Sequence, residues 1–357
     1  MVPTIRAVAQ AAGVSTTTVS FVLNNRRPQV DAIPEETRER VRSCAAALGY
    51  RRNAAAASLR TGRSHWIGVV VQPLRDERDA HMWAPYELAL LSGAQNTLTR
   101  NGYFAVLGAK SPTGGMEYLD ELVPSRIGGI IYRRPLRKVV QRLDELAADG
   151  MPSIAVFPRN KSDRYPYCVD MDNLKAEQMA AELLLRSGAR DPMYVINEPD
   201  YALHPEIDRA KGLTDVMEGE LGFGPAKCEV PWADGDDGKI EVIMDAIRQN
   251  HPDAIMAGEP GCSYLTTVAI ERLGLESPRD ISVIGYDCYF FPNPRGQRIS
   301  AIATSWFRAG QVAAEGILGL VRDRTEWTEP ILLNPQFLAG DTTPPEIADE
   351  GEFYWLF

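Results

Sequence analysis

The chain has 357 residues, of which 45% are hydrophobic and 24% charged, and it carries a formal net charge of −10. This composition indicates a folded protein of two or three domains and excludes a disordered chain. No apolar run reaches the roughly 18 residues of a membrane span, the first residues lack a signal-peptide core, and the five scattered cysteines favour a reducing cytoplasm over a disulfide framework or zinc site.

The charge is divided unevenly along the chain. Residues 1–65 contain ten Arg and four acidic residues, a net charge of +6, whereas the remainder contains 28 basic and 44 acidic residues, a net charge of −16. A basic first segment on an acidic body indicates that this segment binds a polyanion and the body does not. The alternative is that the uneven charge is a chance variation in local composition with no functional meaning.

The first 25 residues predict two short helices joined by a turn. Thr4 is expected to cap the first helix and Gly13 to end it, while Ser15 caps the second. This pattern predicts a helix-turn-helix, whose second helix enters the DNA major groove with its N-terminal residues nearest the bases. Three hydroxyl side chains are expected on or near the free face of that helix: Thr16, Thr17 and Ser20. A small solvated helical hairpin is the alternative.

A third helix and a basic segment follow. Pro34 fits the first position of a helix with an apolar stripe of Val41, Cys44, Ala45 and Leu48, which Gly49 closes. In residues 51–63, RRNAAAASLRTGR, Asn53 is expected to cap a short alanine helix that carries Leu59 among arginines. A single Leu on so short a basic helix has little core to join, so we expect it to insert between base pairs in the DNA minor groove. The helix is too short to be stable alone and is expected to form only on DNA.

The segments TIRAVAQAAGVSTTTVSFVLN, EETRERVRSCAAALGY and NAAAASLRTGR resemble the DNA-binding head and hinge of the lactose/galactose-repressor (LacI) family in sequence and spacing. The resemblance implies Leu59 as the minor-groove lever and a DNA-contacting set of Thr4, Ser15, Thr16, Thr17, Ser20, Phe21, Asn24, Arg26 and Asn53. Phe21 departs from the Arg or His usual in the family, so we expect it to contact a thymine methyl. Arg52 replaces the usual Pro, Ala57 replaces a common Arg, and the loop after the second helix is about four residues longer.

From Trp66 onward, continuous apolar runs alternate with helical stretches. The runs, typical of buried parallel strands, cover residues 66–73, 103–109, 128–134, 153–159, 193–199, 254–260 and 281–287. The helical stretches cover 86–100, 139–150, 174–188, 206–222, 239–250 and 264–274. This alternation over more than 200 residues predicts doubly wound parallel sheets in two lobes with a cleft between them.

The predicted fold is therefore an all-α helix-turn-helix head (1–50), a hinge and linker (51–65), an α/β body (66–343) and a C-terminal tail (344–357). The resemblance implies a periplasmic-binding-protein-like body. Its first lobe would contain 66–163 and 297–325, and its second lobe 164–296 and 326–343. The aromatic tail is expected to pack on the body or on a dimer interface.

Ligands of such sheets bind beyond the carboxyl ends of the strands. Residues at these ends include Gln72, Arg159, Glu259 and Asp287, and Asp170 and Asp172 lie in YCVDMDN. Carboxylates, an Arg and aromatic faces suit a small polar ligand, particularly a sugar; for each residue alone, a helix cap or a core position is the alternative. The resemblance implies a ligand-contacting set of Tyr86, Arg159, Asp172, Arg209, Trp232, Glu259, Asp287, Thr304 and Trp306.

The pocket departs from the family at two places. Glu259-Pro260 replaces the usual Asn-Asp, and Cys288 replaces a second acidic residue. A polyol, an amino sugar or a cationic ligand is therefore as consistent with these residues as a common sugar.

These observations predict a cytoplasmic, nucleoid-associated, sequence-specific transcriptional regulator, expected to be a homodimeric repressor on a palindromic operator. A small polar effector is expected to alter the angle between the lobes and thereby hinge folding. No cofactor, metal or membrane partner is expected. The alternative is a two-lobed binding protein or an enzyme with no DNA role; the sequence contains no G-x-G-x-x-G, P-loop, H-E-x-x-H or G-x-S-x-G motif.

Overall fold

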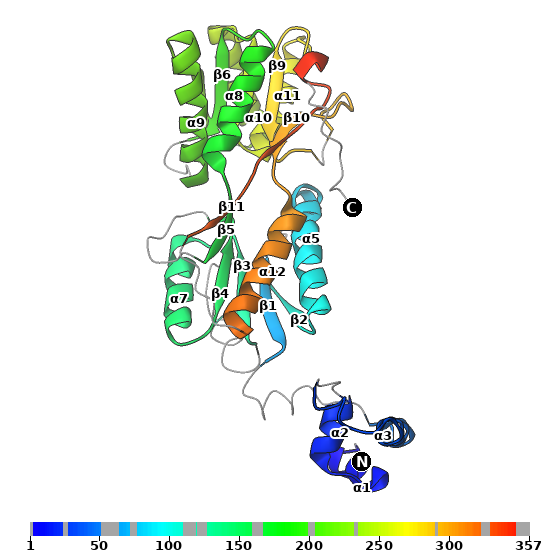
Figure 1. Cartoon of the computed structure of the whole chain (residues 1–357). Helices are drawn as coiled ribbons and strands as arrows, with labels where there is room; N and C mark the ends of the chain where they lie inside the picture. Colours follow the sequence, from blue (N-terminus) through cyan, green and yellow to red (C-terminus); the bar gives the residue numbers. More distant parts are fainter. Residues whose placement is uncertain are drawn as a thin grey trace. The chain divides into compact units, whose positions relative to one another are not determined.

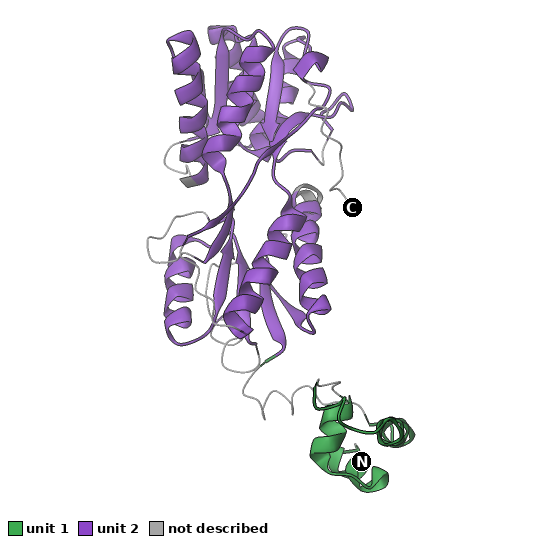
Figure 2. Cartoon of the chain, in the orientation of Figure 1, with its two compact units in different colours: residues 1–64 green, residues 65–357 purple. Residues whose placement is uncertain are grey.

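The computed structural model of the chain describes residues 3–23, 28–50, 64–71, 77–109, 119, 127–158, 167–198, 204–231, 235–289, 292–322 and 329–347. The chain divides into two compact units, a head (1–64) and a body (65–357), which are coloured separately in Figure 2. The predicted hinge helix with Asn53 and Leu59, the positions Asn24 and Arg26, and the aromatic end of the tail lie outside the described residues.

Among its described residues the head contains three helices, α1 (Ile5–Ala12), α2 (Thr16–Leu23) and α3 (Glu35–Ala47), shown in Figure 1. The predicted caps are confirmed: Thr4 Oγ1 accepts from the backbone of Ala7 at 3.3 Å, and Ser15 Oγ accepts from the backbone of Thr18 at 3.0 Å. Gly13 ends α1 in the left-handed conformation, φ 65°. Apolar residues of all three helices form one small core, which includes Val8, Val19 and Val41.

Three details of the head differ from the prediction. Ser20 is buried rather than free, because it lies beside Val19 and one turn before Leu23 on the side of α2 that faces the core. Leu48 is 40% exposed, because it is the C-cap of α3 and lies past the last turn that packs on the core. Pro34 is the N-cap of α3, with extended backbone, rather than its first helical residue.

The body contains two six-stranded sheets among its described residues. The first sheet has the order β11-β5-β4-β3-β1-β2 and is parallel throughout. Its strands are β1 (Trp66–Val71), β2 (Phe104–Ala109), β3 (Gly129–Arg133), β4 (Ser153–Val156), β5 (Cys168–Met171) and β11 (Ile331–Leu333). Most of these strands are buried on both faces, as their apolar runs predicted.

The second sheet has the order β12-β10-β9-β8-β6-β7. All its pairs are parallel except the one between β10 and β12. Its strands are β6 (Pro192–Asn197), β7 (Ala226–Val230), β8 (Ala254–Ala257), β9 (Ser282–Tyr286), β10 (Ser300–Ala303) and β12 (Gln336–Leu338).

Helices cover both sheets (Figure 1). The first lobe carries α5 (Glu77–Arg100), α7 (Arg137–Ala148) and α12 (Trp306–Arg322). The second lobe carries α8 (Asn173–Arg186), α9 (His204–Leu221), α10 (Asp236–Asn250) and α11 (Pro260–Arg272), and a 3₁₀ turn, η2 (Pro345–Ile347), packs on its core. Doubly wound lobes were predicted, and this architecture confirms them.

The chain crosses between the lobes three times: after β5, after β10, and between β11 and β12 (Figure 1). The lobe boundaries taken from the resemblance are therefore wrong at three strands, since β5 and β11 belong to the first sheet and β10 belongs to the second. An apolar run shows that a strand is buried but not which sheet it joins. At the crossing, the backbone of Asp172 donates to the carbonyl of Leu333 at 3.1 Å.

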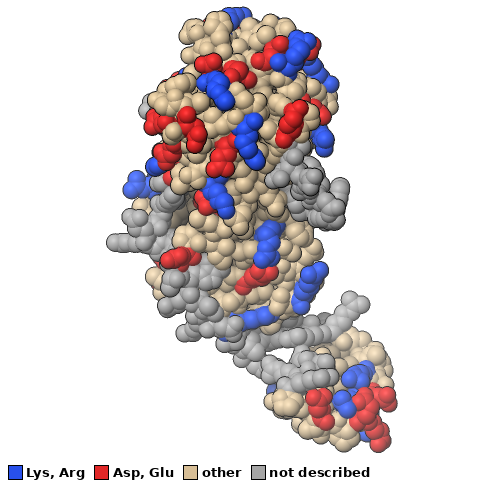
Figure 3. Space-filling view, turned by 45° about the horizontal axis from the view of Figure 1, so that its top comes forward, with Lys and Arg blue, Asp and Glu red and all other residues tan. Residues whose placement is uncertain are grey.

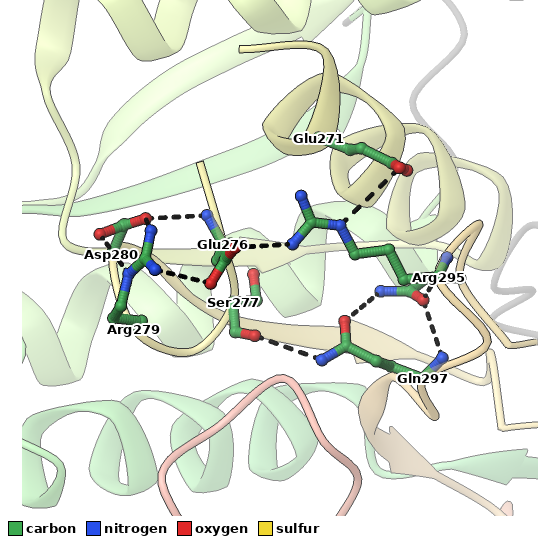
Figure 4. A network of polar contacts seen from close by, with 8 residues as sticks. Glu271, Glu276, Ser277, Arg279, Asp280, Arg295 and Gln297 are labelled. Atoms are coloured by element: carbon green, nitrogen blue, oxygen red, sulfur yellow. Dashed lines mark hydrogen bonds and ion pairs between the residues drawn. The ribbon is translucent and has the colours of Figure 1, made fainter. Parts of the chain in front are cut away.

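A polar network on the second lobe joins the end of α11 to the loop before β10 (Figure 4). Arg295 lies between two carboxylates, with Nε 3.7 Å from Glu271 Oε1 and Nη1 3.5 Å from Glu276 Oε1. Gln297 Nε2 donates to the carbonyl of Ser277 at 3.4 Å. The network thereby holds the loop against the helix end.

Replacing Asn293 in this loop with alanine is expected to lower the free energy of unfolding by about 1–3 kcal/mol, because two partly buried hydrogen bonds lose their acceptor. Asn293 is 7% exposed, and its Oδ1 accepts from the backbone of Arg295 at 3.0 Å and of Gln297 at 2.9 Å. Chemical denaturation measures the change. Arg279→Ala is the control: it removes an exposed pair with Asp280 and should have a much smaller effect, and equal effects would contradict the prediction.

Candidate functional site

The two lobes share one cleft, which opens beyond the carboxyl ends of strands from both sheets. It encloses about 610 Å³, counted to its open mouth. Residues at or just past the ends of five strands line it: Arg134 (β3), Phe157 (β4), Asp170 (β5), Asp287 (β9) and Thr304 (β10). Helices contribute Trp83, Asn173, Pro205, Glu206, Arg209, Pro260 and Trp306, and Glu259 and Tyr286 complete the wall. This is the place that the strand-end rule predicted.

Three wall residues adopt left-handed backbone conformations that only glycine adopts without cost. Arg134 has φ 48°, Phe157 has φ 51° and Asp287 has φ 43°. Each such conformation costs about 1–3 kcal/mol and persists only where the surrounding structure holds it. These three residues lie at the carboxyl ends of β3, β4 and β9. Because strained backbone conformations cluster at functional sites, they support the cleft as the candidate site.

Asp287 holds the first-lobe side of the cleft in place. Its carboxylate accepts from the backbone of Thr304 and from Trp306 Nε1, both at 3.1 Å. Its carbonyl accepts from the hydroxyl of Tyr86. Burial raises the pKa of Asp287 to about 6, and the two donors act against that rise. Asp287 therefore fixes the orientation of Trp306 while it lines the cleft itself.

Arg209 is the central cation of the second-lobe side. Its Nε donates to the carbonyl of Pro205 at 3.1 Å, one terminal nitrogen donates to the carbonyl of Gly258, and Cζ lies 3.8 Å from the centre of the Tyr286 ring. Burial opposes its charge, but the neighbouring Tyr286, Tyr194, Glu206 and Glu177 outweigh burial and raise the pKa of Arg209 above its ordinary value. Arg209 therefore stays cationic at every accessible pH.

Glu177, on α8 behind Arg209, is fully buried, and neither carboxyl oxygen has a hydrogen-bond partner among the described residues. Burial raises its pKa to about 8, with Arg209 acting in the opposite direction. Between the unfolded pKa of about 4.5 and the folded pKa of about 8, the unfolded chain releases this proton while the folded protein keeps it, so the free energy of unfolding falls across this range and levels off above it. We expect Glu177→Gln to gain stability relative to the unmodified protein as pH rises from about 4.5 to 8, at about 1.4 kcal/mol per unit of pKa difference.

Thermal melts of both proteins across this pH range measure the difference. Glu182→Gln on the same helix is the matched control and should show no such divergence. Parallel stability curves for Glu177→Gln and the unmodified protein would contradict the expectation.

A buried ion pair supports the cleft from behind. Arg133 Nη1 lies 3.0 Å from Glu87 Oε1, and both side chains are almost fully buried. Arg133 also stacks on Trp306, with Cζ 4.8 Å from the ring centre. The Tyr86 ring lies 5.2 Å from the Trp306 ring. Trp306 is thus packed between an aromatic ring and a cation.

The structure brings together five of the nine predicted ligand residues, because Arg209, Glu259, Asp287, Thr304 and Trp306 all line the cleft. Two lie elsewhere. Tyr86 is fully buried behind Trp306, and Asp172 caps α8 by accepting from the backbone of Lys175 at 3.1 Å. Because β5 ends at Met171, Asp172 lies past the strand and caps α8, whereas Asp170, still within the strand, lines the cleft. Arg159 and Trp232 lie outside the described residues.

Several wall residues were not predicted. Arg134 and Phe157 directly follow the observed strands β3 and β4, but they lie inside the predicted runs 128–134 and 153–159, so the strand-end rule was applied too late in the sequence to find them. Trp83 and Glu206 come from α5 and α9, where no local pattern separates a cleft residue from an ordinary helical one. Tyr286 lies inside the predicted apolar run 281–287, where nothing in the sequence marked it as a cleft residue.

On the head, Thr16 and Thr17 are exposed at the start of α2, and Phe21, one turn after Thr17, is partly exposed. Thr18 takes part in the N-terminal cap of α2, because its Oγ1 lies 2.9 Å from Ser15 Oγ. The exposed face of α2 is therefore made of two hydroxyls and one aromatic ring.

Arginines on α3 are paired with acids of the same helix, and Figure 3 shows acidic and basic side chains adjacent on the head. Arg38 Nη2 lies 2.7 Å from Glu35 Oε2, and Arg42 Nη1 lies 3.2 Å from Glu35 Oε1. Six of the ten arginines of residues 1–65 fall in segments 24–27 and 51–63, outside the described residues. The excess positive charge of the head thus belongs mainly to those two segments.

A helix-turn-helix head joined to a two-lobed ligand-binding body is the architecture of an effector-controlled transcriptional regulator. Comparisons with known proteins agree. Residues 4–53 match the family model "Bacterial regulatory proteins, lacI family", and residues 181–343 match the "Periplasmic binding protein-like domain".

The chain is 25% identical over 338 residues to the HTH-type transcriptional regulator RegA of Clostridium saccharobutylicum, covering 92% of this chain and 96% of that protein. It is 27% identical over 297 residues to the sucrose operon repressor of Streptococcus mutans, covering 80% and 83%. Among solved structures, the lac repressor dimer bound to operator and the anti-inducer ONPF matches its fold with a TM-score of 0.71 at 21% identity, covering 96% and 99% of the two chains.

Residues 4–53 carry a DNA-binding domain of the lacI family and residues 181–343 a periplasmic-binding-protein-like domain, and the predicted resemblance is confirmed. It is a DNA-binding transcriptional regulator with an effector-binding body. Because the family consists of regulators, the prediction that the chain is not an enzyme is also confirmed. In the described part of the chain, no helix is long and apolar enough to cross a membrane.

Proposed function

We propose that this protein is a cytoplasmic, nucleoid-associated repressor that binds a palindromic operator as a homodimer, and that a sugar or sugar derivative in the interlobe cleft controls this binding. The observation that carries the proposal is the composition of the cleft wall. Asp170 and Trp306 come from the first lobe, whereas Arg209 and Glu259 come from the second, so a ligand in the cleft ties the two lobes together. The similar lac repressor structure is described as bound to operator, and the similar Streptococcus mutans protein is named as a repressor of a sucrose operon. Both names support the proposal.

In the proposed mechanism, ligand binding changes the angle between the lobes and thereby the spacing of the two heads of a dimer. Three crossing segments are the only covalent links between the lobes in the described chain, so they form the hinge of this motion. Segment 51–63 would couple the motion to DNA by folding around Leu59 only when the heads are correctly spaced. Such coupling between two sites is typically worth about 1–3 kcal/mol.

The proposed DNA contacts come from the cap residues and the exposed face of α2, namely Thr4, Ser15, Thr16, Thr17 and Phe21, together with Asn24, Arg26, Asn53 and Leu59. The buried Ser20 would act through the packing of α2. In the cleft, Arg209, Glu259, Asp287, Thr304 and Trp306 would contact the ligand. Tyr86 would act by packing against Trp306, and Asp172 by capping α8. Arg159 and Trp232 are also proposed as ligand contacts.

Operator selection with the full-length chain, followed by footprinting, tests the proposal. We expect a palindromic site with a thymine opposite Phe21, and affinity that falls steeply with salt because the arginines displace counterions. Phe21→Ala should lose the thymine preference by about tenfold, equivalent to about 1.4 kcal/mol, while other positions of the site stay unchanged. A chain that enriches no duplex, or binds with no salt dependence, overturns the proposal.

A further inference from the structure

We propose that Tyr86 and the turn 287–289 form a latch that holds the two lobes at one angle while the cleft contains no effector. The turn directly follows β9 of the second sheet, whereas Tyr86 lies on α5 of the first lobe. The proposed function requires the lobes to move, and the inference rests on that function because it names the contacts that oppose the movement.

The first observation is a hydrogen bond that joins the lobes directly. The hydroxyl of Tyr86 donates to the backbone carbonyl of Asp287. Tyr86 is fully buried and Asp287 nearly so, and water therefore does not compete for this bond. Since α5 packs along α12 (Figure 1), the bond connects the helical layer of the first lobe to a strand end of the second.

The second observation is that the turn packs in the core of the other lobe. Tyr289 packs against the core of the first lobe, although its segment continues from β9 of the second sheet. Its ring lies edge-on to the ring of Tyr86, with centroids 5.4 Å apart and planes at 72°. The same tyrosine of α5 thus contacts both ends of the turn.

The third observation is a second attachment of Asp287 to the first lobe. Its carboxylate accepts from Nε1 of Trp306, the first residue of α12, at 3.1 Å. Asp287 is therefore bonded to α5 through its carbonyl and to α12 through its carboxylate. Attachment at two points opposes rotation of the lobes as well as their separation.

The fourth observation is the strained backbone of Asp287, which has φ 43°. A non-glycine residue keeps this conformation only where its surroundings hold it. Its amide donates to the carbonyl of Ile302 at 2.9 Å, and its carbonyl and carboxylate bond to the first lobe. Loss of the bond from Tyr86 is therefore expected to let Asp287 relax and to release the turn.

The latch is placed where a ligand can act on it. Asp287 and Trp306 both line the cleft, and Tyr86 packs directly behind Trp306. A ligand that bonds to Asp287 or stacks on Trp306 changes the contacts that hold the turn. The latch thereby connects occupation of the cleft to the angle between the lobes.

Distances between spin labels on the two lobes test the inference on the full-length protein without any ligand. The labels are attached at Lys138→Cys on α7 and Glu241→Cys on α10, two exposed positions, and Cys44→Ser removes the one native cysteine that is not buried. Tyr86→Phe keeps the ring and removes only the hydroxyl. It is expected to broaden the distance distribution or to shift its maximum by more than about 2 Å.

Two further variants make the test specific. Tyr289→Leu removes the ring contact at the other end of the turn and should change the distances as Tyr86→Phe does. Tyr103→Phe is the matched control, because its ring packs in the same core against His65 and Arg322, both of the first lobe. Unchanged distances in both latch variants, or an equal change in Tyr103→Phe, overturn the inference.

Operator affinity separates the latch from the proposed function. If the lobe angle controls DNA binding, Tyr86→Phe changes the affinity for the selected operator by about fivefold or more without any ligand. Changed lobe distances with unchanged operator affinity would contradict the proposed function and leave the latch standing. Changed operator affinity with unchanged lobe distances would overturn the latch.

Discussion

Replacing Glu87 with glutamine is expected to lower the free energy of unfolding of the body by about 3–5 kcal/mol. The pair of Glu87 and Arg133 is almost completely buried, at 6% and 1% side-chain exposure, so the substitution leaves a guanidinium charge in the core without its counterion. Removing one partner of a buried pair costs more than the pair itself is worth, because the remaining charge cannot regain its hydration. Urea denaturation of the full chain measures the loss.

Two further variants separate this mechanism from general damage. Glu87→Gln combined with Arg133→Met should recover much of the lost stability, because no uncompensated charge remains. Arg248→Gln breaks an exposed pair with Asp245 and should change stability by no more than about 1 kcal/mol. If the double variant is less stable than Glu87→Gln alone, the buried-charge explanation fails. Since Arg133 stacks on Trp306, ligand affinity should fall together with stability in the single variant.

Replacing Gly310 with alanine is expected to lower the free energy of unfolding by about 1–3 kcal/mol or more. At this position α12 lies so close to α5 that a Cβ atom would overlap the backbone carbonyl of Leu90. The contact is reciprocal, because a Cβ atom at Gly93 of α5 would overlap the carbonyl of Phe307. Backbone atoms cannot move aside as a flexible side chain can, so the two helices must separate along the first lobe.

Gly219→Ala is the matched control on α9. The position is exposed, and a Cβ atom there meets nothing within 4 Å. Alanine should therefore stabilise the helix by about 0.4–1 kcal/mol, because it restricts the unfolded chain without a clash. Calorimetric melts of both variants give the comparison. A Gly310→Ala protein as stable as the Gly219→Ala protein would show that the close helix contact does not exist in solution.

The sequence by itself determined the local structure of this protein. Apolar periodicity and cap chemistry are properties of neighbouring residues, so Thr4, Gly13 and Ser15 predicted the ends of the head helices correctly. The runs of β1, β3, β8 and β9 predicted buried parallel strands, and the carboxyl-end rule placed Glu259 and Asp287 in the cleft. Short or partly exposed elements, such as β7, β11 and β12, carried too weak an apolar pattern to be predicted.

Only the tertiary structure decided which lobe each crossing strand joins, which acid of the pair Asp170 and Asp172 lines the cleft, and that Tyr86 packs against Trp306 and is not part of the cleft wall. It also brought Trp83, Arg134 and Glu206 to one wall from three separate segments. The physical reason is the separation, along the sequence, of the residues that determine each feature. A helix cap or an apolar run is set by residues a few positions apart, whereas the surroundings of a side chain depend on segments that are distant in the sequence, as Asp172 and Leu333 are.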